Sequence, residues 1–402
     1  MNRPRLLLLA LDNWYGSARL PKALQAAGFF VGVMAEPDSF ISTSRFVDCH
    51  LAVSVKQIRN GGWSAAAAAL VAFGADLILP ADERAVRFLH FLTRNTAAAN
   101  MPVLRRSLGD LSTLAVRGDR DLIMKLAGAI GVSGTRHSLV TTAQAAIAFA
   151  DDAGWPVFLK RDGTYAGQGV RRCADEETLT QAFVDLSGDR PGLHTWRSAW
   201  ARGKHMVRTM LSGPDPLMNR GDDPSCIVEA EVVGQPAFFT GVALDGRMLA
   251  GVSAAVSMFH PKPAGPSTQL RLHHDREMTD IAARLVEDLG FSGFFGLDFM
   301  RTLEGRLLFL EFNQRPTSVA HLGGLVDNDL CAALYAGLSG NPPRVAPAES
   351  EAAIALFPQD WLRDSDPGGR IGLYADIPVD DPKLLAAYHA RLRRHADVAG
   401  SD

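Results

Sequence analysis

The sequence has few cysteines, and their positions exclude two common kinds of stabilising site. Only four occur in 402 residues, and none forms a CxxC pair or belongs to a His-Cys cluster. A disulfide framework and a structural zinc site are therefore not expected. Scattered thiols of this kind are typical of a reducing compartment, so we expect a cytoplasmic protein. The four residues are Cys49, Cys173, Cys226 and Cys331.

Excess charge and long apolar runs are also missing. The formal net charge is −3, which gives no electrostatic argument for binding nucleic acid or a membrane surface. The apolar run Leu6–Leu11 is too short to cross a bilayer, and no small-residue cleavage site follows it. We therefore expect neither a nucleic-acid nor a membrane partner, and no signal peptide.

Two nucleotide-binding fingerprints are absent as well. The loop Asp12–Gly16 follows an apolar strand, at the end of a sheet where open α/β folds place ligands. It contains no GxGxxG, so a dehydrogenase is disfavoured and a simple connecting loop is the preferred interpretation. No GxxxxGK[ST] sequence occurs, and we find no internal repeat or low-complexity linker.

The chain is instead rich in alternating strand and helix patterns. Apolar residues make up 47% of the sequence and charged residues 21%, which fits a globular protein of two or three domains. In the first 80 residues the pattern predicts strands over 5–11, 29–34 and 76–80, with helices over 17–27 and 63–73. This alternation predicts a mostly parallel α/β layer.

The most informative stretch is 292–316, which predicts two short strands joined by a turn at Glu304-Gly305. Pairing outward from that turn places Asp298 opposite Glu311, and Asn313 shares the face of Glu311. The other face is predicted to be apolar. Its expected members are Phe295, Leu297 and Phe299 on the first strand and Leu308, Leu310 and Phe312 on the second.

Two opposed carboxylates repel each other unless a cation lies between them. Mg²⁺ prefers oxygen ligands and commonly takes one or two carboxylates together with substrate phosphates. Arg315 follows closely and can hold a phosphate or carboxylate oxygen. The alternative is a solvated hairpin face, which we disfavour because Glu311 and Asn313 lie within the apolar run LLFLEFN.

Two further basic residues indicate an anion site. A strand over 157–161 carries Lys160, and the loop after it contains Gly163, Gly167 and Gly169, which let backbone N–H groups approach phosphate. A glycine-rich hairpin turn and a surface lysine would look alike. Arg120 begins a predicted helix, where a cation is not stabilised by the helix dipole, so a nearby anion is expected.

The ordered set of these elements resembles the ATP-grasp superfamily, in its carbamoyl-phosphate-synthase-like and carboxylate–amine ligase branch. The resemblance rests on Arg120 before a helix that Asp119 can cap, PVFLKRDGTYAGQGV, the motif IVEAEVVG in a predicted strand over 226–233 that ends at Gly234, a predicted hairpin about Asp245-Gly246 and a helix, then GLDFM…LEFNQRP. It implies an α/β and α+β fold. We expect a parallel α/β domain over 1–112, a two-lobed ATP-grasp domain over 113–338 with a lid over about 155–228, and an extension over 339–402.

The resemblance also implies roles for individual residues. Arg120 and Lys160 would hold ATP phosphates, with the loop Gly163–Gly169 as a lid. Arg315 and Lys160 would act on the transferred phosphate. The residues implied at the adenine and ribose are Glu229, Ala230, Glu231 and Val232, and those implied to hold Mg²⁺ (or Mn²⁺) are Asp298, Glu311 and Asn313.

The activity implied is that of an ADP-forming ligase, which phosphorylates a small carboxylate for attack by an amine or similar nucleophile. The alternative is a non-catalytic ATP-binding regulatory module, and a homo-oligomer is possible in either case. Three features depart from the family pattern. The segment GQPAFF lacks the acid that often binds ribose, so Glu231 is its substitute; Gly296 replaces an arginine found in one related group; and the usual N-P-R reads Asn313-Gln314-Arg315. No second ATP-grasp half, glutaminase or biotin-carrier segment is expected.

Overall fold

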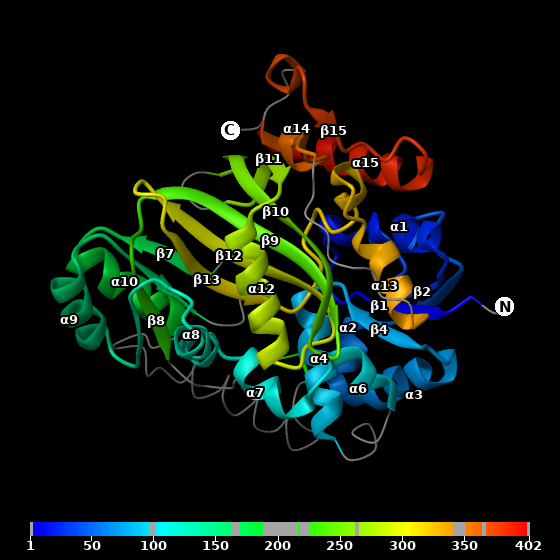
Figure 1. Ribbon diagram of the computed structural model, residues 1–402, viewed down its shortest axis with the longest axis horizontal. Coiled ribbons are helices and arrows are strands. Elements are labelled where there is room, and N and C mark those ends of the chain that lie inside the picture. Colours follow the sequence, from blue (N-terminus) through cyan, green and yellow to red (C-terminus); the bar gives the residue numbers. More distant parts are fainter. Residues whose placement is uncertain are drawn as a thin grey trace.

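The computed structural model describes residues 3–95, 102–161, 169–187, 216–217, 225–261, 265–340, 350–363 and 367–399. Within these ranges the strands form three sheets: a parallel sheet near the N-terminus, a small antiparallel sheet and a long central sheet (Figure 1). The expected combination of a parallel α/β layer with a larger α+β body is confirmed. In the same ranges no helix combines the length and the apolar character that crossing a membrane requires.

The N-terminal layer is a parallel sheet with strand order β3-β2-β1-β4. Its central strand is fully buried from Leu6 to Leu9, which explains the apolar run in the sequence. The sequence did not indicate β3, a half-exposed edge strand. The strands are β1 (Arg5–Leu9), β2 (Phe30–Ala35), β3 (Cys49–Ala52) and β4 (Leu77–Pro80). The main helices of the layer are α1 (Leu20–Ala27), α3 (Trp63–Phe73), α4 (Glu83–Arg94) and α6 (Pro102–Leu108).

The small sheet has strand order β5-β8-β6-β7 and is antiparallel throughout. Its strands are β5 (His137–Val140), β6 (Val157–Lys160), β7 (Val170–Cys173) and β8 (Cys226–Ala230). Helices α9 (Ala143–Ala153) and α10 (Glu176–Ser187) pack on it, and α7 (Leu114–Arg117) and α8 (Arg120–Ala129) lead into it.

The strand expected over 226–233 is shorter than predicted. β8 ends at Ala230, and Glu231–Val233 connects the small sheet to the central one. Val233 is 67% exposed, so the apolar residues at the end of the predicted strand are not core residues. Gly234 begins the next strand instead of ending this one, because its backbone lies against the carbonyl of Arg301.

The central sheet has strand order β13-β12-β9-β10-β11-β14-β15. The predicted hairpin about Asp245-Gly246 is confirmed: both residues have positive φ, 48° and 77°, as a two-residue type I′ turn requires. Helix α12 (Arg276–Asp288) covers one face with its buried apolar stripe (Figure 1). The strands not yet bounded are β9 (Gly234–Leu244), β10 (Arg247–Phe259), β11 (Ser267–His273), β12 (Gly293–Thr302), β13 (Leu307–Asn313), β14 (Ala352–Ala355) and β15 (Tyr374–Ala375).

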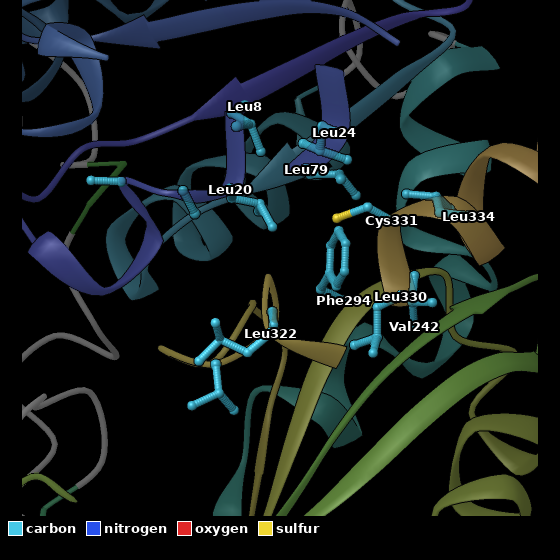
Figure 2. Packing of buried hydrophobic residues seen from close by; sticks show 14 of the residues in the cluster. Leu8, Leu20, Leu24, Leu79, Val242, Phe294, Leu322, Leu330, Cys331 and Leu334 are labelled. Carbon is cyan, nitrogen blue, oxygen red and sulfur yellow. The ribbon is translucent and has the colours of Figure 1, made fainter. Parts of the chain in front are cut away.

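A second core lies between the central sheet and the N-terminal layer. Helix α13 (Leu330–Leu338) inserts Leu330, Cys331 and Leu334 between strands of the two sheets (Figure 2). The same cluster includes Leu356 and Tyr388 from the segment that carries β14, β15, α14 (Gln359–Arg363) and α15 (Pro382–Ala399). The segment after residue 338 therefore completes both the sheet and the core, and its description as a separate extension stays a prediction.

Two glycines make room for one buried aromatic ring in the central sheet. Gly241 and Gly251 face each other across β9 and β10, and a Cβ on Gly251 would lie 2.1 Å from the ring of Phe239. Phe239 is fully buried and cannot swing away. Overfilling a close-packed interior destabilises a protein by about 1–3 kcal/mol.

We predict that Gly251→Ala lowers the free energy of unfolding by about 1–3 kcal/mol because the added methyl group has no space. The matched control is Gly128→Ala in α8, where an added Cβ meets nothing within 4 Å. That change should stabilise the protein by about 0.5–1 kcal/mol. Urea unfolding of both variants measures the difference, and equal midpoints would contradict the packing argument.

Candidate functional site

The β12–β13 hairpin places Asp298 opposite Glu311, as predicted, although its turn and its register near the turn differ from those predicted. Thr302 N–H donates to the Arg306 carbonyl (2.8 Å), so the turn has three residues and ends at Gly305 with φ 82°. This shifts the pairing near the turn by one residue. A β-bulge at Leu310 then shifts it back before Glu311 is reached.

The same bulge changes which residues of β13 are buried. The prediction that Leu308 and Leu310 belong to the apolar face is wrong, because the register there differs by one residue from that assumed. Leu307 and Phe309 are buried in their place, and Phe312 is buried as expected. The apolar face of β12 is also as predicted: Phe295, Leu297 and Phe299 are fully or almost fully buried.

The opposite face of the hairpin carries the expected polar residues in contact with one another. Asn313 Nδ2 donates to Asp298 Oδ2 at 3.0 Å. Arg120 Nη2 lies 2.7 Å from Glu311 Oε1. Asp119 caps α8 by accepting from the N–H groups of Asp121 and Leu122, which fixes Arg120 in the first helical turn. The position of Arg120 at the start of a helix predicted a nearby anion, and that anion is the Glu311 carboxylate.

The two carboxylates differ in pKa. Burial and the neighbouring Glu311 charge raise the pKa of Asp298 to about 6, although Arg315, Asn313 and Arg120 oppose this. Burial also acts to raise the pKa of Glu311, but Arg120, Lys160 and Arg315 lower it below its usual value. Glu311 is therefore the carboxylate whose charge is compensated, and Asp298 is the one that lacks sufficient compensation.

Lys160 lies in a nearly buried ion pair rather than on the surface. Its Nζ is 2.7 Å from Glu229 Oε2, with side chains 12% and 6% exposed. Glu229 is opposite Phe158, so Lys160 is its diagonal neighbour on the same face of the small sheet. Its charge also lowers the pKa of Glu311.

The predicted glycine lid lies largely outside the described residues. Gly163 and Gly167 fall in the range 162–168 and are not described. Gly169 is described, and its carbonyl accepts from Arg161 N–H at 2.9 Å, which closes the base of the loop.

The predicted adenine and ribose residues lie where β8 ends. Ala230 N–H already donates to the Arg136 carbonyl at 2.9 Å. Glu231 accepts from Arg172 at 2.6 Å and 3.0 Å in a bidentate pair. Val232 lies in the connector between the small and central sheets. The structure thus brings these residues to the junction of the two sheets, with Glu231 paired to an arginine.

The loop Asp12–Gly16, interpreted from sequence as a connection, contacts the hairpin. The Arg315 guanidinium lies 5.1 Å from the centre of the Trp14 ring. A Cβ on Gly16 would come within 2.1 Å of that ring, so a glycine is needed there. Asp12 is paired with Arg84 at 2.8 Å. The only signal for this contact in the sequence was the position of the loop after the first strand.

The missing arginine at Gly296 has a local explanation. Gly296 pairs with Asn313, and a Cβ on it would lie 2.7 Å from Cγ2 of Thr317. The segment after Arg315 thus occupies the space that a longer side chain would need. Among the described residues no three His, Cys, Asp or Glu side chains gather as metal ligands, so a metal here would rely on two carboxylates and Asn313.

Comparison with known proteins gives a consistent assignment. Residues 119–194 match the model of the carbamoyl-phosphate synthase L chain, ATP binding domain. A D-alanine–D-alanine ligase of Pseudomonas entomophila (strain L48) is 23% identical over 211 residues, 52% of this chain and 56% of the ligase. The chain therefore spans about half the length of this curated relative.

Solved structures are similar over most of the chain. The biotin carboxylase domain of Hydrogenobacter thermophilus 2-oxoglutarate carboxylase, bound to MgADP, ADP and bicarbonate, has a TM-score of 0.64, 15% identity, and coverage of 88% of this chain and 75% of that one. N5-carboxyaminoimidazole synthetase from Staphylococcus aureus, bound to ADP, has a TM-score of 0.59, 12% identity, and coverage of 90% and 85%. The matched motif region, the curated relative and the similar solved structures all indicate the ATP-grasp superfamily.

Proposed function

We propose that this protein is an ATP-dependent ligase that activates a small carboxylate as an acyl phosphate and joins it to an amine, releasing ADP and phosphate. The observation that carries the proposal is the opposed pair Asp298 and Glu311 on one hairpin face, with Arg120, Lys160 and Arg315 all close enough to lower the pKa of Glu311. Phosphoryl transfer depends mainly on positioning and on neutralising charge, and this arrangement provides for both.

Mg²⁺ (or Mn²⁺) fits the residues present. Two carboxylates directly opposite each other and an amide beside them offer hard oxygen ligands, and the raised pKa of Asp298 indicates that this carboxylate lacks compensating positive charge. Asp298, Glu311 and Asn313 would hold the ion. When bound, it would neutralise part of the charge on the nucleotide phosphates.

The basic residues would then exchange partners. Arg120 is paired with Glu311 and Lys160 with Glu229. Nucleotide phosphates offer both cations a stronger anionic partner, so we propose that they turn to the phosphates when ATP binds. Each cation is already placed at the site by its present ion pair, which limits the ordering that binding requires.

The acid substrate would lie between the Asp12–Gly16 loop and the hairpin. Arg315 extends from the hairpin to Trp14 of that loop, so its guanidinium lies where the two layers meet. There it would orient the substrate carboxylate for attack on the γ-phosphate, with ADP as the leaving group. The amine would next attack the acyl carbon and lose a proton, and the carbon–oxygen bond to phosphate would break.

The similar proteins also support the proposed reaction type, although they do not identify the substrates of this protein. The curated relative is a D-alanine–D-alanine ligase, and two similar structures contain ADP. We also propose that the protein works in the cytoplasm, since all four cysteines are free thiols. One similar structure is a dimer, and a homo-oligomer is our corresponding proposal.

The product pattern tests the reaction type. Incubation with Mg·ATP and a panel of amino acids and small carboxylic acids should give ADP and inorganic phosphate in equal amounts, because the γ-phosphate is transferred. Hydroxylamine added with the correct acid should trap a hydroxamate even without the amine. Formation of AMP and pyrophosphate would contradict the proposal, because it would show an adenylate intermediate.

Glu311→Gln should reduce ADP formation at least about 100-fold, because the change removes a charged ligand while keeping the side-chain shape. The control is Glu351→Gln, which alters an exposed pair with Arg271 and should leave the rate unchanged. Steady-state ADP release measures both variants. Full activity of Glu311→Gln at saturating Mg²⁺ would remove Glu311 from the metal site.

Asp298→Asn should stabilise the nucleotide-free protein by on the order of 1 kcal/mol at about pH 7.5. The folded-state pKa of Asp298 is about 6, above its ordinary value of 3.8, so ionisation of this carboxyl disfavours the folded state. In the wild type, the contribution of the Asp298 carboxyl to the free energy of unfolding is greatest below its unfolded-state pKa of 3.8. This contribution is lost as pH rises through its folded-state pKa of about 6. The advantage of the amide variant should therefore shrink at about pH 5.

Urea unfolding at the two pH values measures this effect. The control Asp275→Asn changes a carboxylate that caps α12 and pairs with Arg301 at 2.5 Å, so it should destabilise the protein. In addition, Mg·ADP should raise the unfolding midpoint of the wild type and not that of Asp298→Asn. A destabilised Asp298→Asn at about pH 7.5 would show that the two carboxylates do not repel each other.

A further inference from the structure

The residue between Asn313 and Arg315 is anchored to another part of the molecule. Gln314 is 9% exposed, and its Nε2 donates to the Arg117 carbonyl at 2.9 Å. The two residues are 197 positions apart in the chain. Because Gln314 is bonded to both neighbours, holding its side chain also restricts the backbone from which Asn313 and Arg315 project.

The acceptor for Gln314 is itself firmly held. Arg117 Nη1 donates to the Leu108 carbonyl and Nη2 to the Asp110 carbonyl, both at 2.7 Å. Its guanidinium also lies 5.3 Å from the centre of the Phe291 ring. Arg117 is therefore a fixed point between α6, α7 and the end of the segment that leads into β12.

Three residues after Arg117, the chain contacts the hairpin again. Arg120 pairs with Glu311 at 2.7 Å, and Glu311 lies three residues before Gln314. The short segment 117–120 thus touches β13 and the residue after it at two positions. The first contact joins Arg120, proposed to bind phosphate, to Glu311, proposed to bind the metal ion. The second joins the Arg117 carbonyl to the side-chain amide of Gln314.

His90 of α4 lies against the segment that follows Arg117. It is 7% exposed, and burial together with Arg117 lowers its pKa to about 3. His90 is therefore neutral at ordinary pH and acts as a packing group. Gly118 lies against its ring, since a Cβ there would be 3.9 Å from Nδ1.

Stability alone does not account for this polar cluster. Gln314 Oε1, His90 Nε2 and Arg117 Nε are buried and have no hydrogen-bond partner within the part of the chain that the structure describes. Buried polar atoms without partners are unfavourable, and an aliphatic side chain of similar volume avoids that penalty. A glutamine here is better explained by the position it imposes on its neighbours.

We propose that Gln314 is a positioning residue, which fixes Arg315 and Asn313 relative to Arg120 through its hydrogen bond to the Arg117 carbonyl. This inference rests on the proposed ligase function. Errors of about 1 Å in the placement of a reacting group lower rates by about 100-fold, so the anchor matters for turnover more than for nucleotide binding.

The test compares Gln314→Leu with Gln359→Leu. Gln359 in α14 is a matched control, because it is 7% exposed and its Oε1 also has no hydrogen-bond partner among the described residues. We expect Gln314→Leu to lower kcat for ADP release by about 100-fold. Its dissociation constant for Mg·ADP should stay within about twofold of the wild type, and its urea midpoint should shift no more than that of Gln359→Leu. Equal losses of kcat in the two variants would overturn the proposal.

A second measurement needs neither nucleotide nor substrate. Trp14 lies against Arg315, so its ¹⁹F resonance in 5-fluorotryptophan-labelled protein reports where the arginine lies; Trp14→Phe assigns the signal. The resonance should shift in Gln314→Leu and not in Gln359→Leu. If the wild type makes no ADP with any acid, the ligase function fails while this measurement still tests the anchor. An unshifted Trp14 signal would overturn the positioning role.

Discussion

The repulsion between Asp298 and Glu311 is the constraint around which the other charged groups are arranged. The hairpin register holds the two carboxylates directly opposite each other, and neither can leave without breaking the β12–β13 pairing. Compensating charge must therefore come from elsewhere in the fold. Arg120 comes from α8, Lys160 from the small sheet and Arg315 from the residues after β13, where the N-terminal layer supplies Trp14. A site of this kind exists only when all three sheets are assembled.

The pairing of Asp298 with Glu311 was predictable from the sequence, because two deviations from the assumed hairpin geometry cancel each other. Alternation could not choose the register of β13, because LLFL has apolar residues at successive positions and offers an apolar face in either register. The three-residue turn and the bulge at Leu310 each shift the pairing by one position, in opposite senses. The prediction that Asp298 lies opposite Glu311 is confirmed, whereas the prediction that Leu308 and Leu310 are buried on β13 is wrong.

Other contacts in the site could not be predicted from the neighbouring sequence. Trp14 contacts Arg315 from the other end of the sequence, and Gln314 bonds to Arg117 across 197 positions. Periodicity carries no information about such distant partners. The sequence pattern placed Glu229 and Glu231 on a strand but did not indicate that they pair with Lys160 and Arg172. Caps and turns were easier to predict, since Asp119 and Asp245-Gly246 act within a few residues. The roles of the site residues stay predictions.

The way the last described segment joins the first has a consequence for biosynthesis. Tyr388 is fully buried, and its hydroxyl donates to the Tyr15 carbonyl at 2.8 Å, across 373 positions of the chain. Strand β11 likewise gains its neighbour β14 only about 80 residues later. During synthesis the N-terminal layer emerges first, yet one apolar face of it must wait for nearly the whole chain to leave the ribosome. Part of the apolar core surface of the nascent protein therefore stays uncovered until the segment that contains Tyr388 has been synthesised.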